Sequence, residues 1–248
     1  MRIRIVTPVV PRRVEGESEK KRENRRRQRE DERRRLFGLC PGTEVEFVSI
    51  ERGPTSVECR YDEMLAIPEI VKKLREAESD GCDAAVVNGF VDLGVRVGRE
   101  LVDIPVLGPG ESSMLVASSL CDRFSIVTMV RSFVPLVERN AMECRMTDKL
   151  ASIRVIEVPV LELRKDLDKT VSILADEGRK AVDEDGAQVV ILGCTGMTGM
   201  AAKVSERSGI TVIDPLPAAV KMAESLVRLG LSHSRLAYMR PPEKDRYL

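Results

Sequence analysis

Short runs of apolar, often β-branched residues alternate along the chain with longer charged or amphipathic stretches. Residues 2–6 alternate Arg, Ile, Arg, Ile and Val, which predicts a strand that Pro8 and Pro11 end. Similar runs predict strands at 43–50, 83–87, 104–107, 124–128, 188–192, 210–213 and 235–238. Helices are expected between them, for example over 68–80. Nearly continuous apolar strands that alternate with helices indicate an α/β protein with parallel sheets covered on both faces.

An internal repeat is the most informative feature of the pattern. Residues 83–90 can be laid over 188–195, each a buried strand that ends in a turn of small residues and opens a helix. A second short strand, an Ala/Ser-rich helix and a further strand follow in both copies, so five successive elements agree. Chance similarity between α/β units is the alternative. Gly89 and Cys194 occupy equivalent positions in the repeat.

The repeat predicts two pseudo-symmetric lobes, each a mainly parallel sheet flanked by helices. We assign residues 1–111 plus 230–248 to the first lobe and 112–229 to the second, including a crossover helix after which 235–238 returns to the first sheet. Ligands of open α/β sheets bind beyond the carboxyl ends of the strands. The turns after Val87 and Leu192 should therefore face each other across one active-site cleft.

Composition narrows the classes of partner. The 40 basic residues balance the 40 acidic ones, and aromatic residues are 3%, so neither nucleic acid nor an anionic membrane is expected as a partner. No signal peptide and no membrane-spanning run is visible. The six cysteines are scattered and there is one histidine, which argues against disulfides and a zinc site. We expect a cytoplasmic homo-oligomer that binds a small molecule and needs no metal or cofactor.

The segment 15–35 is almost entirely charged. Its strong helix formers and opposite charges about one turn apart favour a solvated helix, with disorder as the rival interpretation. Interspersed acids and missing aromatics argue against an RNA-binding arm. A helix that docks a partner is possible, but a solvated face is favoured.

Several motifs carry a resemblance to a known family. They are Gly53-Pro54-Thr55-Ser56-Val57-Glu58, Phe124-Ser125-Ile126-Val127-Thr128, Leu192-Gly193-Cys194-Thr195-Gly196-Met197, Val212-Ile213-Asp214 and the helix that begins at Ala218. Together they resemble the hydantoin racemase branch of the aspartate/glutamate racemase superfamily, from about residue 43 to 242. The resemblance implies two α/β lobes with the active site between them and a carbonyl- or carboxylate-bearing substrate.

Two departures from the family pattern fall at the presumed site. Members of the family usually carry two cysteines, which stand on opposite faces of the substrate α-carbon. The second is present here as Cys194, but Gly89 stands where the first would be. The usual Asn-Pro-Asn after the first strand is replaced by Thr7-Pro8-Val9. The departures bear on the reaction rather than on the fold.

Cys194 is the predicted catalytic residue. At a helix start its thiol should have a lowered pKa and work as base or acid, although a buried cysteine that only packs is the alternative. The N–H groups of residues 195–197 would stabilise negative charge on the substrate oxygen. The other predicted substrate-binding residues are Asn88, Gly89, Phe90, Thr55, Ser56, Thr128, Thr195 and Gly196.

Some of these positions have a second interpretation. Thr55 and Ser56 could equally be turn residues, and Thr128 ends a strand, from which it could reach a polar ligand group. Glu111 and Asp214 are expected to cap helices, with a substrate contact as the alternative. His233 lies where a helix ends, so a surface position or a role at the negative end of the helix dipole is favoured over a catalytic triad.

Three functions remain open. The first is a cofactor-independent racemase of hydantoins or related amino-acid derivatives. The second is a one-thiol decarboxylase similar to arylmalonate decarboxylase, in which loss of carbon dioxide creates the carbanion and one cysteine protonates it. The third is a small-molecule binding protein without catalysis.

Overall fold

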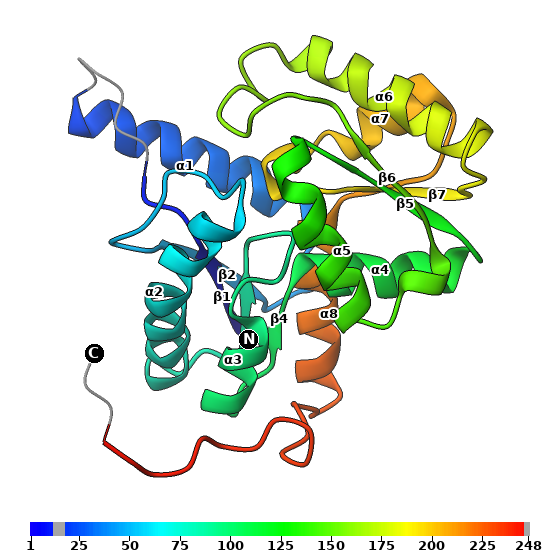
Figure 1. The fold of residues 1–248 in the computed structure, drawn as a ribbon. Helices are drawn as coiled ribbons and strands as arrows, with labels where there is room; N and C mark the ends of the chain where they lie inside the picture. Colours follow the sequence, from blue (N-terminus) through cyan, green and yellow to red (C-terminus); the bar gives the residue numbers. More distant parts are fainter. Residues whose placement is uncertain (12–17, 246–248) are drawn as a thin grey trace.

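The computed structural model describes residues 1–11 and 18–245 as two parallel four-stranded sheets flanked by helices (Figure 1). The first sheet has the order β2-β1-β3-β4 and the second β6-β5-β7-β8. The strands of the first sheet are β1 (Arg2–Thr7), β2 (Glu44–Ser49), β3 (Ala84–Val87) and β4 (Val106–Leu107). Those of the second are β5 (Phe124–Thr128), β6 (Leu150–Val155), β7 (Val189–Leu192) and β8 (Val212–Ile213). The predicted α/β class with two similar lobes is confirmed.

The longer helices connect and cover these strands. They are α1 (Glu19–Leu36), α2 (Arg60–Ser79), α3 (Val95–Leu101), α4 (Pro109–Leu120), α5 (Val134–Glu143), α6 (Leu167–Asp183), α7 (Ala201–Ser208) and α8 (Pro215–Arg228). Helix α2 begins well before the predicted start at Pro68, which lies inside it. The Asp62 carboxylate accepts the Glu58 backbone N–H at 3.0 Å and orders the first turn, so the proline does not mark the helix start.

Both lobes contribute to one continuous core. Buried residues of the first lobe, such as Val87 and Phe90, belong to the same apolar cluster as Ile126 and Leu192 of the second. A second cluster lies on the other face of the first sheet, where helix α8 packs against β1, β3 and β4. The expected crossover of this helix is therefore confirmed, whereas the assignment of residue ranges to lobes stays a prediction.

The strand predicted at 235–238 is wrong. β1 pairs with both β2 and β3 and holds the place in the first sheet that β5 holds in the second. The N-terminal strand thus fills the position that the repeat assigned to 235–238. Residues 235–237 form a turn instead, in which the Tyr238 N–H donates to Ser234 O at 2.9 Å, and Leu236 is 93% exposed.

Side chains of this C-terminal segment, rather than a strand ladder, hold it on the first lobe. Arg235 donates to the carbonyl of Arg99 at 2.8 Å, and the Nε2 atom of His233 accepts the Val106 N–H at 2.7 Å. His233 is therefore half-buried against the edge strand β4, and the expected surface position is wrong.

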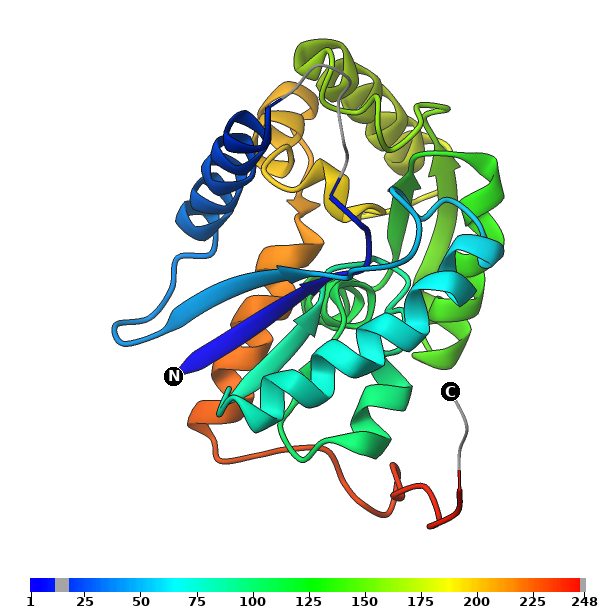
Figure 2. The same cartoon turned by 90° about the vertical axis from the view of Figure 1, so that its left-hand side faces the viewer.

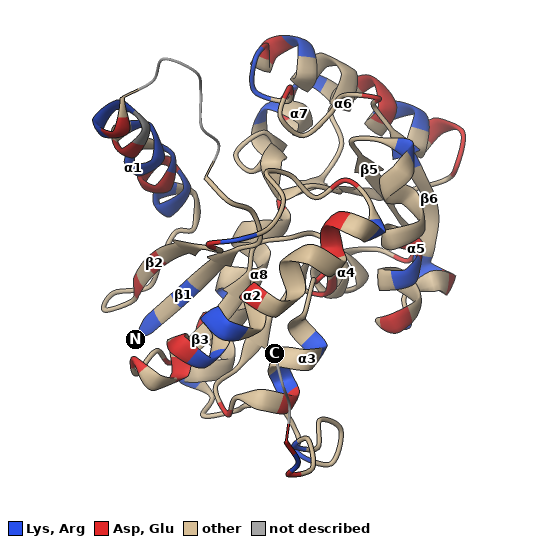
Figure 3. Cartoon of the chain, turned by 60° about the vertical axis from the view of Figure 1, so that its left-hand side comes forward, with Lys and Arg blue, Asp and Glu red and all other residues tan. Residues whose placement is uncertain are grey.

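The charged segment forms the predicted helix where the structure describes it. Helix α1 starts after Ser18, whose hydroxyl accepts the Lys21 N–H at 3.4 Å; residues 15–17 of the predicted segment lie outside the described residues. Acidic residues are interspersed among the more numerous basic residues of the helix (Figure 3). Figure 2 shows α1 standing away from the first sheet with α7 beside it. None of the described helices is long and apolar enough to cross a membrane.

Candidate active site

A pocket of about 1690 Å³ lies at the carboxyl ends of the central strands, and both lobes line it. Eight predicted site residues line this pocket, namely Thr55, Ser56, Asn88, Gly89, Phe90, Cys194, Thr195 and Gly196. They come from the loop after β2, the turn after β3 and the turn after β7. Segments far apart in the sequence therefore meet where the strand pattern placed the cleft.

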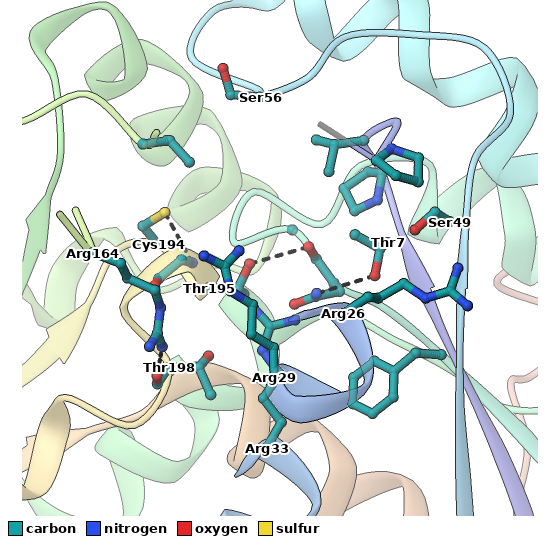
Figure 4. Close-up of a pocket in the computed structure, with 18 of the residues that line it drawn as sticks. Thr7, Arg26, Arg29, Arg33, Ser49, Ser56, Arg164, Cys194, Thr195 and Thr198 are labelled. Atoms are coloured by element: carbon teal, nitrogen blue, oxygen red, sulfur yellow. Dashed lines mark hydrogen bonds between the residues drawn. The ribbon is translucent and has the colours of Figure 1, made fainter. Parts of the chain in front are cut away.

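The turns of the two lobes touch each other directly. The Thr195 hydroxyl donates to the Asn88 carbonyl at 3.2 Å, and the Asn88 side-chain amide donates to Thr7 Oγ1 at 3.5 Å (Figure 4). Because Thr7 ends β1, these two bonds connect the ends of β1, β3 and β7. The connection fixes the relative position of the two predicted turns.

Cys194 follows β7 and is only 6% exposed. Its sulfur accepts the Gly196 backbone N–H at 3.3 Å (Figure 4). Burial nevertheless raises the pKa of the Cys194 thiol to about 11, against the lowering effects of the Gly196 and Met197 N–H groups. The predicted lowering of this pKa is wrong, because loss of solvation outweighs the short helical turn. Cys194 is therefore a thiol, suited to donate a proton, in neutral solution.

Backbone donors near the sulfur are fewer than predicted. Gly196 N–H is directed at Cys194 Sγ, and Met197 N–H donates to the Cys194 carbonyl at 3.0 Å. Among the described residues, the N–H groups of Thr195 and Phe90 have no protein acceptor. One N–H group from each lobe thus remains to hold an oxygen on which negative charge develops.

Gly89 faces the pocket from the first lobe, so no acid or base group stands at the position equivalent to Cys194. The side chains of Leu93 and Pro8 pack where a β-carbon on Gly89 would lie. Gly193 is needed for another reason: a β-carbon there would approach Ile126 Cγ2 at 2.8 Å and the Val127 carbonyl at 3.0 Å. Close packing of β7 on β5 therefore requires glycine just before Cys194.

Thr128 does not reach the pocket, so its predicted substrate contact is wrong. Its side chain is fully buried, and its hydroxyl donates to the Gly193 carbonyl at 3.2 Å. This bond supports the strand end that carries Cys194. Thr128 ends a strand as predicted, but its side chain points into the core and not toward the cleft.

The acidic residues after β4 and β8 act within the fold. The Glu111 carboxylate pairs with Arg99, and Asp214 Oδ2 accepts the Gly199 N–H at 2.6 Å. Asp92 accepts the Gly110 and Glu111 N–H groups at 2.9 and 2.7 Å and caps α4. Among the described residues, no group of three or more His, Cys, Asp or Glu side chains could hold a metal ion.

Sequence reasoning missed the arginines that line this pocket. Arg26, Arg29 and Arg33 extend from α1, and Arg164 extends from the segment before α6 (Figure 4). The α1 arginines are three and four positions apart, so they share one face of the helix. This spacing was the available signal, but alternating charge along the helix favoured a solvated face.

Comparison with known proteins gives a consistent result. Residues 35–223 match the family described as Asp/Glu/hydantoin racemase. The chain is 37% identical over 206 residues to hydantoin racemase of Pseudomonas sp. (strain NS671), which covers 83% of each chain.

Solved structures agree with the family match. An allantoin racemase from Pseudomonas fluorescens superimposes with a TM-score of 0.89 at 30% identity, covering all of both chains. An arylmalonate decarboxylase shares the fold, with a TM-score of 0.61 at 16% identity over 92% of each chain.

Proposed function

Since the chain belongs to the Asp/Glu/hydantoin racemase family, we propose that it inverts a carbon next to a carbonyl in a hydantoin-like substrate, with Cys194 as its proton-transferring group. The observation that supports this most is the position of Cys194. Its sulfur lies in the wall of the pocket at the meeting point of the turns that follow β3 and β7. No cofactor is required for such a proton transfer when backbone donors stabilise the enolate.

The proposed reaction starts when the Cys194 thiol loses its proton to solvent, and the small thiolate fraction that a pKa of about 11 allows takes the proton from the substrate carbon. The electron pair of the broken C–H bond moves to the carbonyl oxygen, which the free N–H groups of Thr195 and Phe90 can hold. Gly196 N–H stabilises the thiolate before the transfer. A proton returns to carbon from the opposite face, beside Gly89, where water is the donor because glycine offers no acid group. Cys194 then returns its proton to solvent.

Gly89 also supports a second candidate function. A decarboxylase of a malonate-type substrate needs only one proton donor. The carbon–carbon bond to the carboxylate breaks, carbon dioxide leaves, and its bonding electrons form the enolate. The neutral Cys194 thiol then donates its proton to that carbon, and solvent reprotonates the sulfur. The raised pKa of Cys194 suits this proton donation.

Proton exchange in heavy water separates these reactions. The enzyme is incubated with panels of hydantoins, amino acids and malonates, and NMR follows deuterium at the reacting carbon, its configuration and carbon dioxide. Exchange with inversion is the expected result. Release of carbon dioxide, with deuterium added to one face of the reacting carbon only, would contradict the racemase and support the decarboxylase.

Two variants test the role of the thiol in that experiment. Cys194→Ala should lower turnover at least about 100-fold, as loss of an acid–base group does. Cys121→Ala is the matched control, since its thiol contacts the Ala117 carbonyl outside the pocket. Turnover that persists in Cys194→Ala, or none by the unmodified enzyme on the whole panel, would contradict the proposal. If the unmodified enzyme turns over no compound of the panel, a small-molecule binding protein without catalysis is the function that remains.

We also propose that the enzyme is a homo-oligomer in the cytoplasm. All six cysteines are free, as expected in a reducing compartment. Exposed apolar side chains such as Met142, Leu120 and Leu229 offer surface for contact between copies. Light scattering at several protein concentrations tests the subunit number, and a monomer at all concentrations would contradict the proposal.

A further inference from the structure

Helix α1 directs arginines into the pocket that contains Cys194. Arg26, Arg29 and Arg33 all line it, and Figure 4 shows Arg29 and Arg33 extending from the helix towards the turn that carries Thr195. Arg164 reaches the same turn from another segment of the chain. Guanidinium groups from two separate elements therefore gather beside the thiol.

Arg33 lacks the ion pairs that other arginines of α1 form. Arg27 pairs with Glu23 at 2.8 Å, and Arg34 pairs with Asp31 at 2.8 Å. In the described part of the chain, no carboxylate lies within 4.0 Å of the Arg33 guanidinium; the ion pairs of the helix are on its other arginines. Burial, with the nearby charges of Arg164 and Arg29, lowers the pKa of Arg33 to about 10.

Hydrogen bonds hold Arg164 at the turn. Its Nε donates to the Gly196 carbonyl at 3.2 Å, and its Nη2 donates to the Thr198 carbonyl. Gly196 is the residue whose N–H donates to the Cys194 sulfur. The position of the Arg164 charge is therefore coupled to the position of the thiol.

Clustered positive charge of this kind is unfavourable by itself. Arg29 and Arg164 are exposed and Arg33 is half-buried, so their like charges repel one another most strongly at Arg33. A bound carboxylate offsets this repulsion, because its two oxygens accept parallel N–H groups from a guanidinium. Since the arginines and the thiol line one pocket, the anion belongs to the molecule on which the thiol acts.

We propose that Arg29, Arg33 and Arg164 bind a carboxylate of the substrate, so that the preferred substrate is an acidic hydantoin or a related carbon acid with a carboxylate. The inference rests on the proposed function. The family match begins at residue 35, whereas Arg29 and Arg33 precede it. Helix α1 is the specificity element in this proposal.

A matched pair of substrates tests the charge preference. Hydantoin-5-acetate carries a carboxylate, and its amide has nearly the same shape without the charge. The enzyme should turn over the carboxylate with a kcat/KM at least about 10-fold higher, as expected for hydrogen bonds to a charged group. Equal values for the two compounds would overturn the proposal.

Variants of the arginines test which residues cause the preference for the carboxylate. Arg33→Met should lower kcat/KM for the carboxylate by about 10- to 100-fold and change kcat/KM for the amide much less. Arg164→Met should lower kcat/KM for both compounds, because its bonds to the turn beside Cys194 are lost, and for the carboxylate by about 10-fold more. Arg33→Lys should recover only part of the loss, because lysine keeps the charge without the planar fork. Arg27→Met is the control, since Arg27 is exposed and outside the pocket lining. Equal losses for both substrates in Arg33→Met would contradict the assignment.

Binding without turnover distinguishes this site from the proposed reaction. Titration calorimetry of Cys194→Ala protein with hydantoin-5-acetate should give an affinity that falls about 10-fold or more when Arg33→Met is added. Such binding without turnover by the unmodified enzyme would refute the reaction and retain the carboxylate site. Turnover with an affinity that does not depend on Arg33 would refute the site and retain the reaction.

Discussion

The side chain of Leu93 occupies the space beside Gly89 in which a β-carbon on residue 89 would lie. Gly89, Leu93 and Cys194 all line the pocket, and in the proposed function Gly89 takes the position of a second thiol facing Cys194. Gly89 and Leu93 therefore depend on each other, because Leu93 fills the space that a side chain on residue 89 would need. Installing a thiol at residue 89 must change both.

We therefore predict different outcomes for a single and a double substitution. Gly89→Cys alone should lower the free energy of unfolding by about 1–3 kcal/mol, because the new side chain overpacks against Leu93. Gly89→Cys with Leu93→Ala should fold and increase exchange with inversion above that of the unmodified enzyme. Leu93→Ala alone is the control. Inversion that stays unchanged in the double variant would show that residue 89 does not face the reacting carbon.

Alkylation of Cys194 should be slow in neutral solution. Its pKa of about 11 leaves under about 1% thiolate below pH 9, and the thiolate is the reactive form. Iodoacetamide labelling, resolved by peptide mass spectrometry, should rise through about pH 11 in the folded protein. In urea the rise should move to about pH 8.5, the ordinary cysteine value.

Labelling of the folded protein that rises below pH 8 would instead support the lowered pKa expected from the sequence. The raised pKa of Cys194 also determines how the free energy of unfolding changes with pH. A raised folded-state pKa stabilises the protein at pH values below the ordinary value, and this contribution is lost as the pH rises through about 11.

The bond between Thr195 and Asn88 should contribute measurably to stability. Thr195→Val keeps the shape but leaves the buried Asn88 carbonyl without its 3.2 Å donor, so the free energy of unfolding should fall by about 1–2 kcal/mol. Thr195→Ser keeps a hydroxyl and should retain most of that stability. Urea unfolding monitored by circular dichroism measures both. Equal losses in the two variants would exclude the hydrogen bond as the cause.

Local patterns in the sequence predicted the parts of the site that depend on strand ends. The apolar runs before Asn88 and Gly193 are central strands, so the residues that follow them meet at one edge. The repeat could not show that the N-terminal strand β1 holds the place assigned to 235–238. That position depends on pairing between distant segments, which no local pattern records.

The sequence also could not predict the direction in which individual side chains point. Thr128 and Cys194 both follow or end central strands, yet Thr128 points into the core and Cys194 lines the pocket. The pKa of Cys194 depends on how completely the folded chain excludes water from the sulfur. Helix α1 is largely exposed, as predicted, but the sequence does not give its position over the pocket. Tertiary packing determines all three properties.

The final prediction concerns His233, the single histidine, whose NMR signals can be identified without further assignment. His233 Nε2 accepts the Val106 N–H, so the proton of the neutral ring is on Nδ1. Burial, together with the charge of Arg99, lowers the pKa of His233 to about 4. Since the chain has one histidine, its NMR spectrum has one imidazole signal set. Nitrogen shifts should show the Nδ1-protonated ring from neutral pH down to about pH 5.

The same shift makes stability depend on pH. Between about pH 6.5, the ordinary histidine value, and the folded-state value of about 4, the unfolded chain binds one more proton than the folded protein. The free energy of unfolding should therefore fall as the pH is lowered through this window, by about 1–2 kcal/mol after solvent screening of this half-buried group. In His233→Gln the side-chain oxygen can accept the Val106 N–H without titrating, so this part of the pH dependence should disappear. If the imidazole titrates near 6.5 in the folded protein, the bond to Val106 does not hold the C-terminal segment on β4.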